Sequence, residues 1–164
     1  MVLIRSATPD DVESARRISV ASGRERWEPN VFVPMPDRLV LVAELEGELV
    51  GVAKTHSHRE PDSGSPAGHY LGGVMVTPTH RRRGVAAALT QTRLNWIWSL
   101  SDHAYYFTNE HNTASIQLHA TFGFSSLGRF PAIHGATADN GASRLILFAA
   151  RKEQPVPVAD STAH

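Results

Sequence analysis

The stretch Val74–Ala86 has the residue types and order of an anion-binding turn. Its apolar start predicts the end of a strand, Pro78 interrupts a sheet ladder because it has no N–H, and a helical pattern begins after Gly84. Arg81–Arg83 add positive charge at the helix N-terminus, where free N–H groups and the helix dipole also favour an anion. The stretch therefore predicts a phosphate site, with a solvated basic turn as the alternative.

A second set of polar residues lies on one face of a predicted helix. In the helix predicted from Thr113 to Thr121, Asn112, Ser115 and His119 are three and four residues apart, so their side chains project from the same side. On this pattern Ile116 and Ala120 turn towards the core instead. The helix can thus present an amide, a hydroxyl and an imidazole to one site.

These two stretches together resemble the GCN5-related N-acetyltransferase (GNAT) family. Arg81-x-x-Gly84-x-Ala86 after a V-x-V strand and a proline is similar to its acetyl-CoA motif. The sequence N-x-x-S-I-x-L-H, followed by Gly-Phe, is similar to the later helix of phosphinothricin-acetyltransferase-like members. About 25 residues separate the two motifs, which a strand and a helix require. The Lys-Ser or Lys-Thr pair of a P-loop and the three spaced glycines of a dinucleotide site are missing.

The resemblance implies acetyl-CoA as the co-substrate and no metal. In that family the turn amides hold the pyrophosphate and the strand backbone pairs with the pantetheine arm, while the backbone N–H of Val76 would donate to the tetrahedral oxyanion. The cofactor-binding residues that the resemblance implies are Val74, Met75, Val76, Arg81, Arg82, Arg83, Gly84, Val85, Ala86, Asn112 and Ser115.

His119 occupies the position where the family commonly has a tyrosine that protonates the departing thiolate. The resemblance therefore implies that His119 is the general acid. A histidine is mostly neutral at neutral pH, so this role works best where nearby negative charge raises its pKa. The alternative is a helix-surface histidine that only hydrogen-bonds.

The general base stays open. Many family members use a glutamate on the strand before the phosphate turn, but here that strand begins with His69 and carries no acid. The candidates are Glu110 and His69, together with His56 and His58 or a water chain between them. A metal on His56 and His58 is disfavoured because a site needs three or four convergent ligands. The predicted substrate-binding residues are Trp27, His56, His58 and His134.

The predicted reaction moves an acetyl group to a primary amine of a small molecule by direct attack in a ternary complex. The chain has no cysteine and no G-x-S-x-G elbow, which favours a mechanism without an acyl-enzyme. The alternatives are an acyl-CoA-binding sensor without turnover and a protein N-terminal or lysine acetyltransferase.

Composition bounds these interpretations. The 164 residues suit a single domain, which we predict over residues 1–152, with a disordered tail over 153–164. With 16 basic and 16 acidic side chains the net charge is zero, which argues against nucleic acid or a membrane surface as a partner. No apolar run approaches a membrane span, and we expect a cytoplasmic protein. The resemblance to the GNAT family also suggests a homodimer.

The elements that must position these residues alternate along the chain. Such alternation indicates an α/β sheet with helices on both faces, and the resemblance adds that the sheet is mixed and mostly antiparallel with about six to seven strands, the GNAT fold. Residues 22–36 are irregular and broken by prolines, and suit a short helix, a substrate lid or a surface loop. Strands are predicted at 2–5, 39–45, 49–57, 69–76, 104–108, 124–130 and 144–150, and helices at 8–20, 84–100 and 113–121. The Glu46-Gly47 pair predicts a tight hairpin turn between the second and third strands, and Thr8 with Asp11 predicts a capping box at the start of the first helix.

Overall fold

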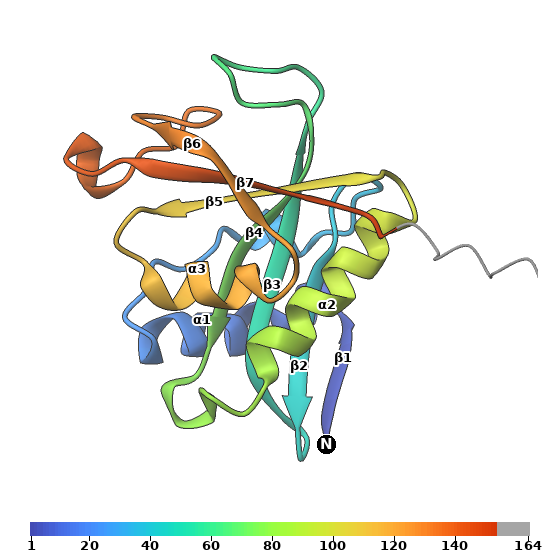
Figure 1. Cartoon of the computed structure of the whole chain (residues 1–164). Coiled ribbons are helices and arrows are strands. Elements are labelled where there is room, and N and C mark those ends of the chain that lie inside the picture. The colour runs from blue at the N-terminus through green and yellow to red at the C-terminus, as the bar shows by residue number, and fades with distance from the viewer. Residues whose placement is uncertain (154–164) are drawn as a thin grey trace, which may run out of the picture.

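The computed structural model describes residues 1–153, which form one seven-stranded sheet in the order β1-β2-β3-β4-β5-β7-β6 (Figure 1). The predicted tail lies, apart from Glu153, outside the described residues. The strands are β1 (Val2–Ser6), β2 (Val40–Leu45), β3 (Glu48–His58), β4 (Gly68–Val76), β5 (His103–Asn109), β6 (Ser125–Phe130) and β7 (Leu145–Arg151), and the helices are α1 (Val12–Ala21), α2 (Val85–Trp98) and α3 (Thr113–Ala120).

The pairing of the strands confirms the predicted mixed, mostly antiparallel sheet. Neighbouring strands are antiparallel except for β4 and β5, which are parallel. These two strands pair only at Tyr70 with Tyr105 and at Leu71 with Tyr106. Figure 1 shows β5 and β7 crossing the sheet at a steep angle to β2, β3 and β4. The sheet therefore opens between β4 and β5 beyond this short contact.

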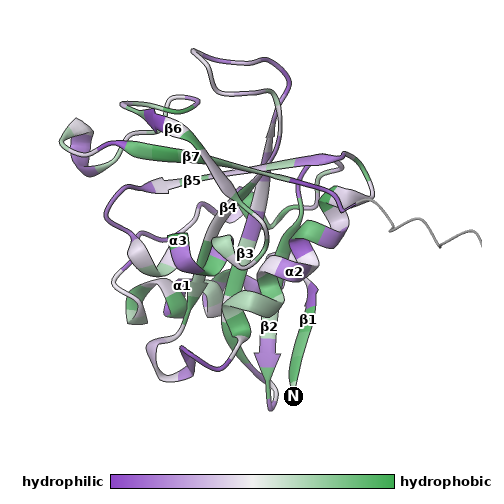
Figure 2. Cartoon of the chain, viewed as in Figure 1, coloured by the Kyte–Doolittle hydropathy of each residue, from purple (hydrophilic) through white to green (hydrophobic). Residues whose placement is uncertain are grey.

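Helices α1 and α2 cover opposite faces of the sheet because residues alternate along the strands. On β2, Val42 belongs to the core cluster that contains the α1 residue Ile18, whereas its neighbours Leu41 and Ala43 pack in the cluster that contains Leu89 of α2. Figure 2 shows hydrophobic residues concentrated on these central strands and on the inner sides of the helices. Two cores thus hold the sheet from both sides.

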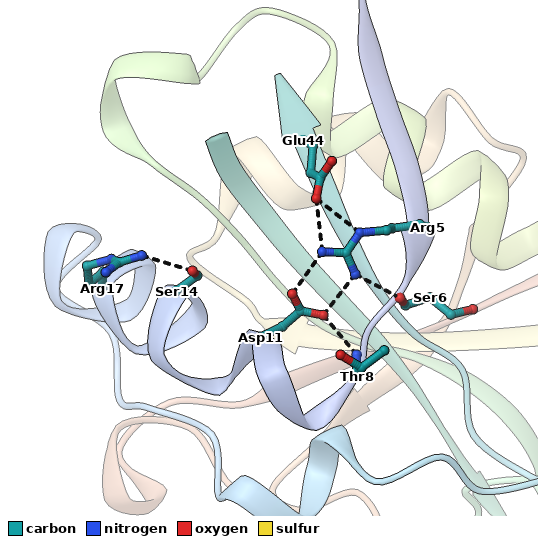
Figure 3. A network of polar contacts seen from close by, with 7 residues as sticks. All are labelled: Arg5, Ser6, Thr8, Asp11, Ser14, Arg17 and Glu44. Atoms are coloured by element: carbon teal, nitrogen blue, oxygen red, sulfur yellow. Dashed lines mark hydrogen bonds and ion pairs between the residues drawn. The ribbon is translucent and has the colours of Figure 1, made fainter. Parts of the chain in front are cut away.

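The entry into α1 is fixed by a network around Arg5 (Figure 3). Its guanidinium donates to both carboxylate oxygens of Asp11, at 2.8 and 2.9 Å, and to Glu44 on β2 at 3.0 Å. Asp11 also accepts from the Thr8 N–H at 2.8 Å, as the predicted capping box requires. Hydrogen bonding to Arg5 lowers the pKa of Asp11, so the carboxylate stays ionised.

Three local predictions have clear outcomes. The hairpin between β2 and β3 is confirmed, with positive φ at Glu46 and Gly47 as a tight primed turn requires. The core prediction for α3 is confirmed for Ile116, which packs against a core cluster, and is wrong for Ala120, which is exposed while its neighbour His119 is buried. The irregular segment 22–36 forms a single 3₁₀ turn, Pro29–Phe32. Within residues 1–153 no helix has both the length and the apolar character needed to cross a membrane.

Candidate active site

The opening between β4 and β5 forms a cleft of about 940 Å³. One edge of β4 is paired with β3, and the Thr77 N–H still donates to Val50 on that side. Because backbone groups alternate along a strand, the N–H groups of Val76 and Val74 face the cleft. The Val76 carbonyl accepts from Ser22, a residue that also lines the cleft, at 3.3 Å. The cleft is thus bordered by backbone donors that an extended ligand arm can pair with.

A buried arginine on α2 supports the strands at this opening. The register of β3 and β4 shifts between Ala53 and Thr55. There the guanidinium of Arg93 donates to the carbonyls of Lys54 at 3.0 Å and Gly72 at 3.1 Å. Arg93 is fully buried and has no acidic partner in the part of the chain that the structure describes. Its hydrogen bonds satisfy carbonyls that the irregular ladder leaves free.

The predicted phosphate turn has the geometry of an anion site. Arg82 and Gly84 have φ of 64° and 78°, so the chain turns sharply into α2, and no side chain among residues 1–153 caps this helix. Its first N–H groups are therefore free at the positive end of the helix dipole. Arg81 and Arg82 line the cleft, whereas Arg83, predicted with them, does not. The other predicted cofactor-binding residues, Val74, Met75, Val76, Gly84, Val85, Ala86, Asn112 and Ser115, all line it.

Helix α3 forms the opposite wall. Asn112 caps this helix, since its side-chain oxygen accepts from the Ser115 N–H at 3.2 Å. The Ser115 hydroxyl is hydrogen-bonded to the hydroxyl of Tyr106, and both residues line the cleft. The predicted polar face of this helix therefore meets a strand residue that sequence reasoning missed. Tyr106 lies in a Tyr- and Phe-rich strand directly before the N-x-x-S helix, which was the available signal.

His119 is held as a neutral ring. It is 2% exposed, and its Nδ1–H donates to the Ser115 carbonyl at 2.8 Å, while Nε2 is buried without a partner among the described residues. Burial lowers its pKa to about 4, and the charge of Arg93 also lowers it. The condition under which the general-acid role works best, a pKa raised by nearby negative charge, is not met. The general-acid role stays a prediction, and one that this geometry disfavours, because the ring has no free proton at neutral pH.

The base candidates Glu110 and His69 lie outside the cleft lining. Glu110 is paired with Arg129 and accepts from the Arg144 N–H at 2.6 Å, and these contacts lower its pKa. Glu110 thus connects the C-terminal end of β5 to β6 and to the start of β7. His69 packs edge-on against Trp96 of α2 at 5.6 Å between ring centroids. Neither residue is placed to accept a proton from a ligand in the cleft, so both remain unsupported predictions.

Of the predicted substrate-binding residues, His56 lines the cleft, whereas Trp27, His58 and His134 do not. The Trp27 ring packs over Gly73, where an added Cβ would lie 3.1 Å from the indole, and Lys54 lies 4.5 Å from the indole centroid. His56 and Lys54 line the cleft. The His58 ring meets His56 edge-on and stacks on the ring of His134. No three His, Cys, Asp or Glu side chains converge on a metal position among residues 1–153. Lys54 was not predicted, and no sequence signal pointed to it.

Comparison with known proteins agrees with this geometry. The model of the acetyltransferase (GNAT) family matches residues 9–124. The fold is similar to the ribosomal-protein-S18-alanine N-acetyltransferase of Escherichia coli (TM-score 0.74, 18% identity, 96% and 97% of the two chains covered). It is also similar to a putative phosphinothricin N-acetyltransferase (TM-score 0.69, 23% identity, 94% and 100% covered) and to Arabidopsis thaliana NAA60 in complex with acetyl-CoA (TM-score 0.71, 22% identity, 92% and 98% covered).

No curated protein matches the chain in sequence. The structural likenesses show the shared fold, and the family model spans well over half of the chain. The chain therefore belongs to the acetyltransferase (GNAT) family and is an acetyl-CoA-dependent acetyltransferase.

Proposed function

We propose that this enzyme transfers the acetyl group of acetyl-CoA to a primary amine of a small molecule by direct attack. The observation that carries the proposal is the cleft between β4 and β5, which joins an uncapped basic helix end on one side to a pocket of aromatic and basic side chains on the other. The turn would hold the pyrophosphate, and the free edge of β4 would pair with the pantetheine arm. The thioester would then lie where the two strands separate.

The contacts around the acceptor end favour a small amine. Residues 131–143 fold back onto the sheet, where Ile133 is fully buried beside Tyr70, and His134 stacks on His58. Trp27 covers the neighbouring strand at Gly73. These contacts bound the space behind His56, so the acceptor would enter a pocket rather than lie along an open groove.

The chain's own groups supply the remaining steps. The amine nitrogen forms a bond to the thioester carbon, and the Val76 N–H would stabilise the oxyanion that develops. As the C–S bond breaks, the thiolate accepts a proton from the hydroxyl pair of Tyr106 and Ser115, and this pair regains a proton from the nitrogen, which loses one on becoming an amide. Burial raises the pKa of Tyr106, so its hydroxyl carries a proton at neutral pH. His119 would act as a positioning residue that packs against Tyr106 and binds the Ser115 backbone.

Release of free coenzyme A thiol tests this function. The purified chain would be mixed with acetyl-CoA and a panel of small primary amines, amino acids, polyamines and short peptides. Turnover on small amines with little on peptides is the expected result. Preference for peptides would identify a protein acetyltransferase, and tight acetyl-CoA binding with no turnover on any amine would identify a sensor.

A further inference from the structure

Three histidines form a connected cluster at the acceptor end of the cleft. His56 Nδ1 and His58 Nε2 lie 2.8 Å apart, so one ring donates a hydrogen bond to the other. The His58 ring stacks on His134, with 3.7 Å between centroids and 6° between planes. Tyr70, which is fully buried, packs against all three rings at 5.2 Å between centroids. The three imidazoles thus surround one immobile side chain.

The outer side of the cluster is fixed by the backbone. His134 Nε2 donates to the Pro66 carbonyl at 2.9 Å, and the Tyr70 hydroxyl donates to the same oxygen at 2.6 Å. His134 has a φ of 46°, in the left-handed region that residues with side chains rarely adopt. Such a conformation persists where surrounding contacts determine it. These contacts hold the His134 ring and, through the stack, the orientation of His58.

The inner side of the cluster faces the ligand. His56 lines the cleft between Lys54 and Phe107. Its Nδ1 is hydrogen-bonded to His58, which leaves Nε2 as the ring nitrogen available to a ligand. His58 is partly exposed at the surface. A hydrogen-bonded pair of rings therefore leads from the acceptor pocket towards solvent.

An amine attacks a thioester only as the free base, so its proton must leave the pocket. Resting on the proposed function, we propose that His56 is the general base and that the His56–His58 pair relays the proton to solvent. His56 Nε2 takes a proton from the ammonium form of the acceptor and leaves the free base that attacks, while the His56 Nδ1 proton moves to His58 Nε2. His58 releases its own Nδ1 proton to water. The pair returns to its first tautomer through water when the product leaves.

The surroundings of His56 disfavour its imidazolium form and therefore favour transfer of the proton to His58. The titratable groups that face it are Lys54 and His58 on β3, Tyr70 on β4 and His134 from the loop, with Tyr105 of β5 behind Tyr70. No carboxylate contacts the three rings within residues 1–153. Burial, followed by the charges of His58 and Lys54, lowers the pKa of His56 to about 3. Transfer through both nitrogens leaves His56 neutral after each step.

The test compares His56→Gln, His56→Phe and His58→Gln with wild-type enzyme on the best amine of the panel and on hydroxylamine, whose nitrogen is a free base at neutral pH. His56→Phe keeps the ring packing against Tyr70 and removes both nitrogens. Both His56 variants should lower kcat about 100-fold at pH 7, and His58→Gln about 10-fold, with an unchanged Kd for acetyl-CoA. The deficit should shrink as pH rises and should be small with hydroxylamine. The exposed His103→Gln is the matched control and should keep wild-type rates.

The outcomes separate the relay from the function on which it rests. A wild-type enzyme that acetylates no amine overturns the proposed function and the relay with it. Wild-type turnover with an unchanged kcat in the His56 variants overturns the relay alone. A loss of equal size at every pH and with both nucleophiles assigns His56 a structural role and also overturns it.

Discussion

The imidazole of His119 lies flat against the phenol ring of Tyr106, with 3.6 Å between ring centroids and 5° between planes. This stack joins α3 to β5 at the point where β5 separates from β4. It places a tyrosine hydroxyl beside Ser115 although the helix itself carries histidine at the family's tyrosine position. The burial of the His119 ring and the chemistry of the Tyr106 hydroxyl are therefore linked.

The free energy of unfolding should decrease as the pH is lowered, because the buried His119 ring is neutral in the folded chain. The pKa of His119 is about 4 in the folded chain, against the ordinary value of 6.5 that we take for the unfolded chain. Between pH 4 and pH 6.5 the unfolded chain therefore binds more protons than the folded chain. The stabilising effect of the neutral ring is complete above pH 6.5 and is lost as pH falls towards 4. From pH 7 to pH 5 it amounts to about 2 kcal/mol, which His119→Phe should remove from the pH dependence of urea unfolding. Equal pH slopes in this variant and wild type would contradict the assignment; the exposed His103→Phe is the control.

The Tyr106 hydroxyl should matter more for turnover than for binding. Tyr106→Phe keeps the stack on His119 and removes the proton donor, so kcat should fall roughly tenfold to a hundredfold while the Kd for acetyl-CoA stays the same. Tyr105→Phe is a matched control, because Tyr105 lies one position earlier on β5 and faces the other side of the sheet. If both variants keep the wild-type kcat, the thiolate takes its proton from elsewhere.

Arg93 should be essential for stability. Arg93→Met leaves the carbonyls of Lys54 and Gly72 buried without a donor, and we expect a loss of about 3 kcal/mol in the free energy of unfolding. Chemical denaturation of this variant beside Arg17→Met, an exposed arginine of α1, measures the difference. The control should stay within about 0.5 kcal/mol of wild type. A loss below 1 kcal/mol for Arg93→Met would show that water replaces the guanidinium.

Much of the secondary structure could be predicted from local sequence patterns. The seven strands and three helices lie within a few residues of their predicted positions, because alternation and helical periodicity are properties of short segments. The common face of Asn112, Ser115 and His119 follows from the same periodicity. Which face of α3 is buried depends on its packing partner, and so the prediction for Ala120 failed and the burial of His119 against Tyr106 was not foreseen.

Contacts between distant segments could not be predicted in this way. The cleft depends on the register shift in β3 and on Arg93, which joins residues far apart in the sequence. Tyr106 enters the site by stacking on a side chain of another element. The histidines of β3 meet His134 only because residues 131–143 fold back over the sheet. Each of these features depends on tertiary structure, and no local pattern encodes it.

The basic turn offers a comparison between adjacent arginines. Arg81 and Arg82 line the cleft and Arg83 does not, although all three are exposed and carry the same charge. Arg81→Gln and Arg82→Gln should each weaken coenzyme A binding about fivefold, which corresponds to about 1 kcal/mol for an exposed ion pair with phosphate. This loss should diminish at high salt because exposed charges are screened. Arg83→Gln should bind coenzyme A as wild type does in calorimetry. An equal loss from all three variants would show that the turn attracts the anion by net charge rather than by contact.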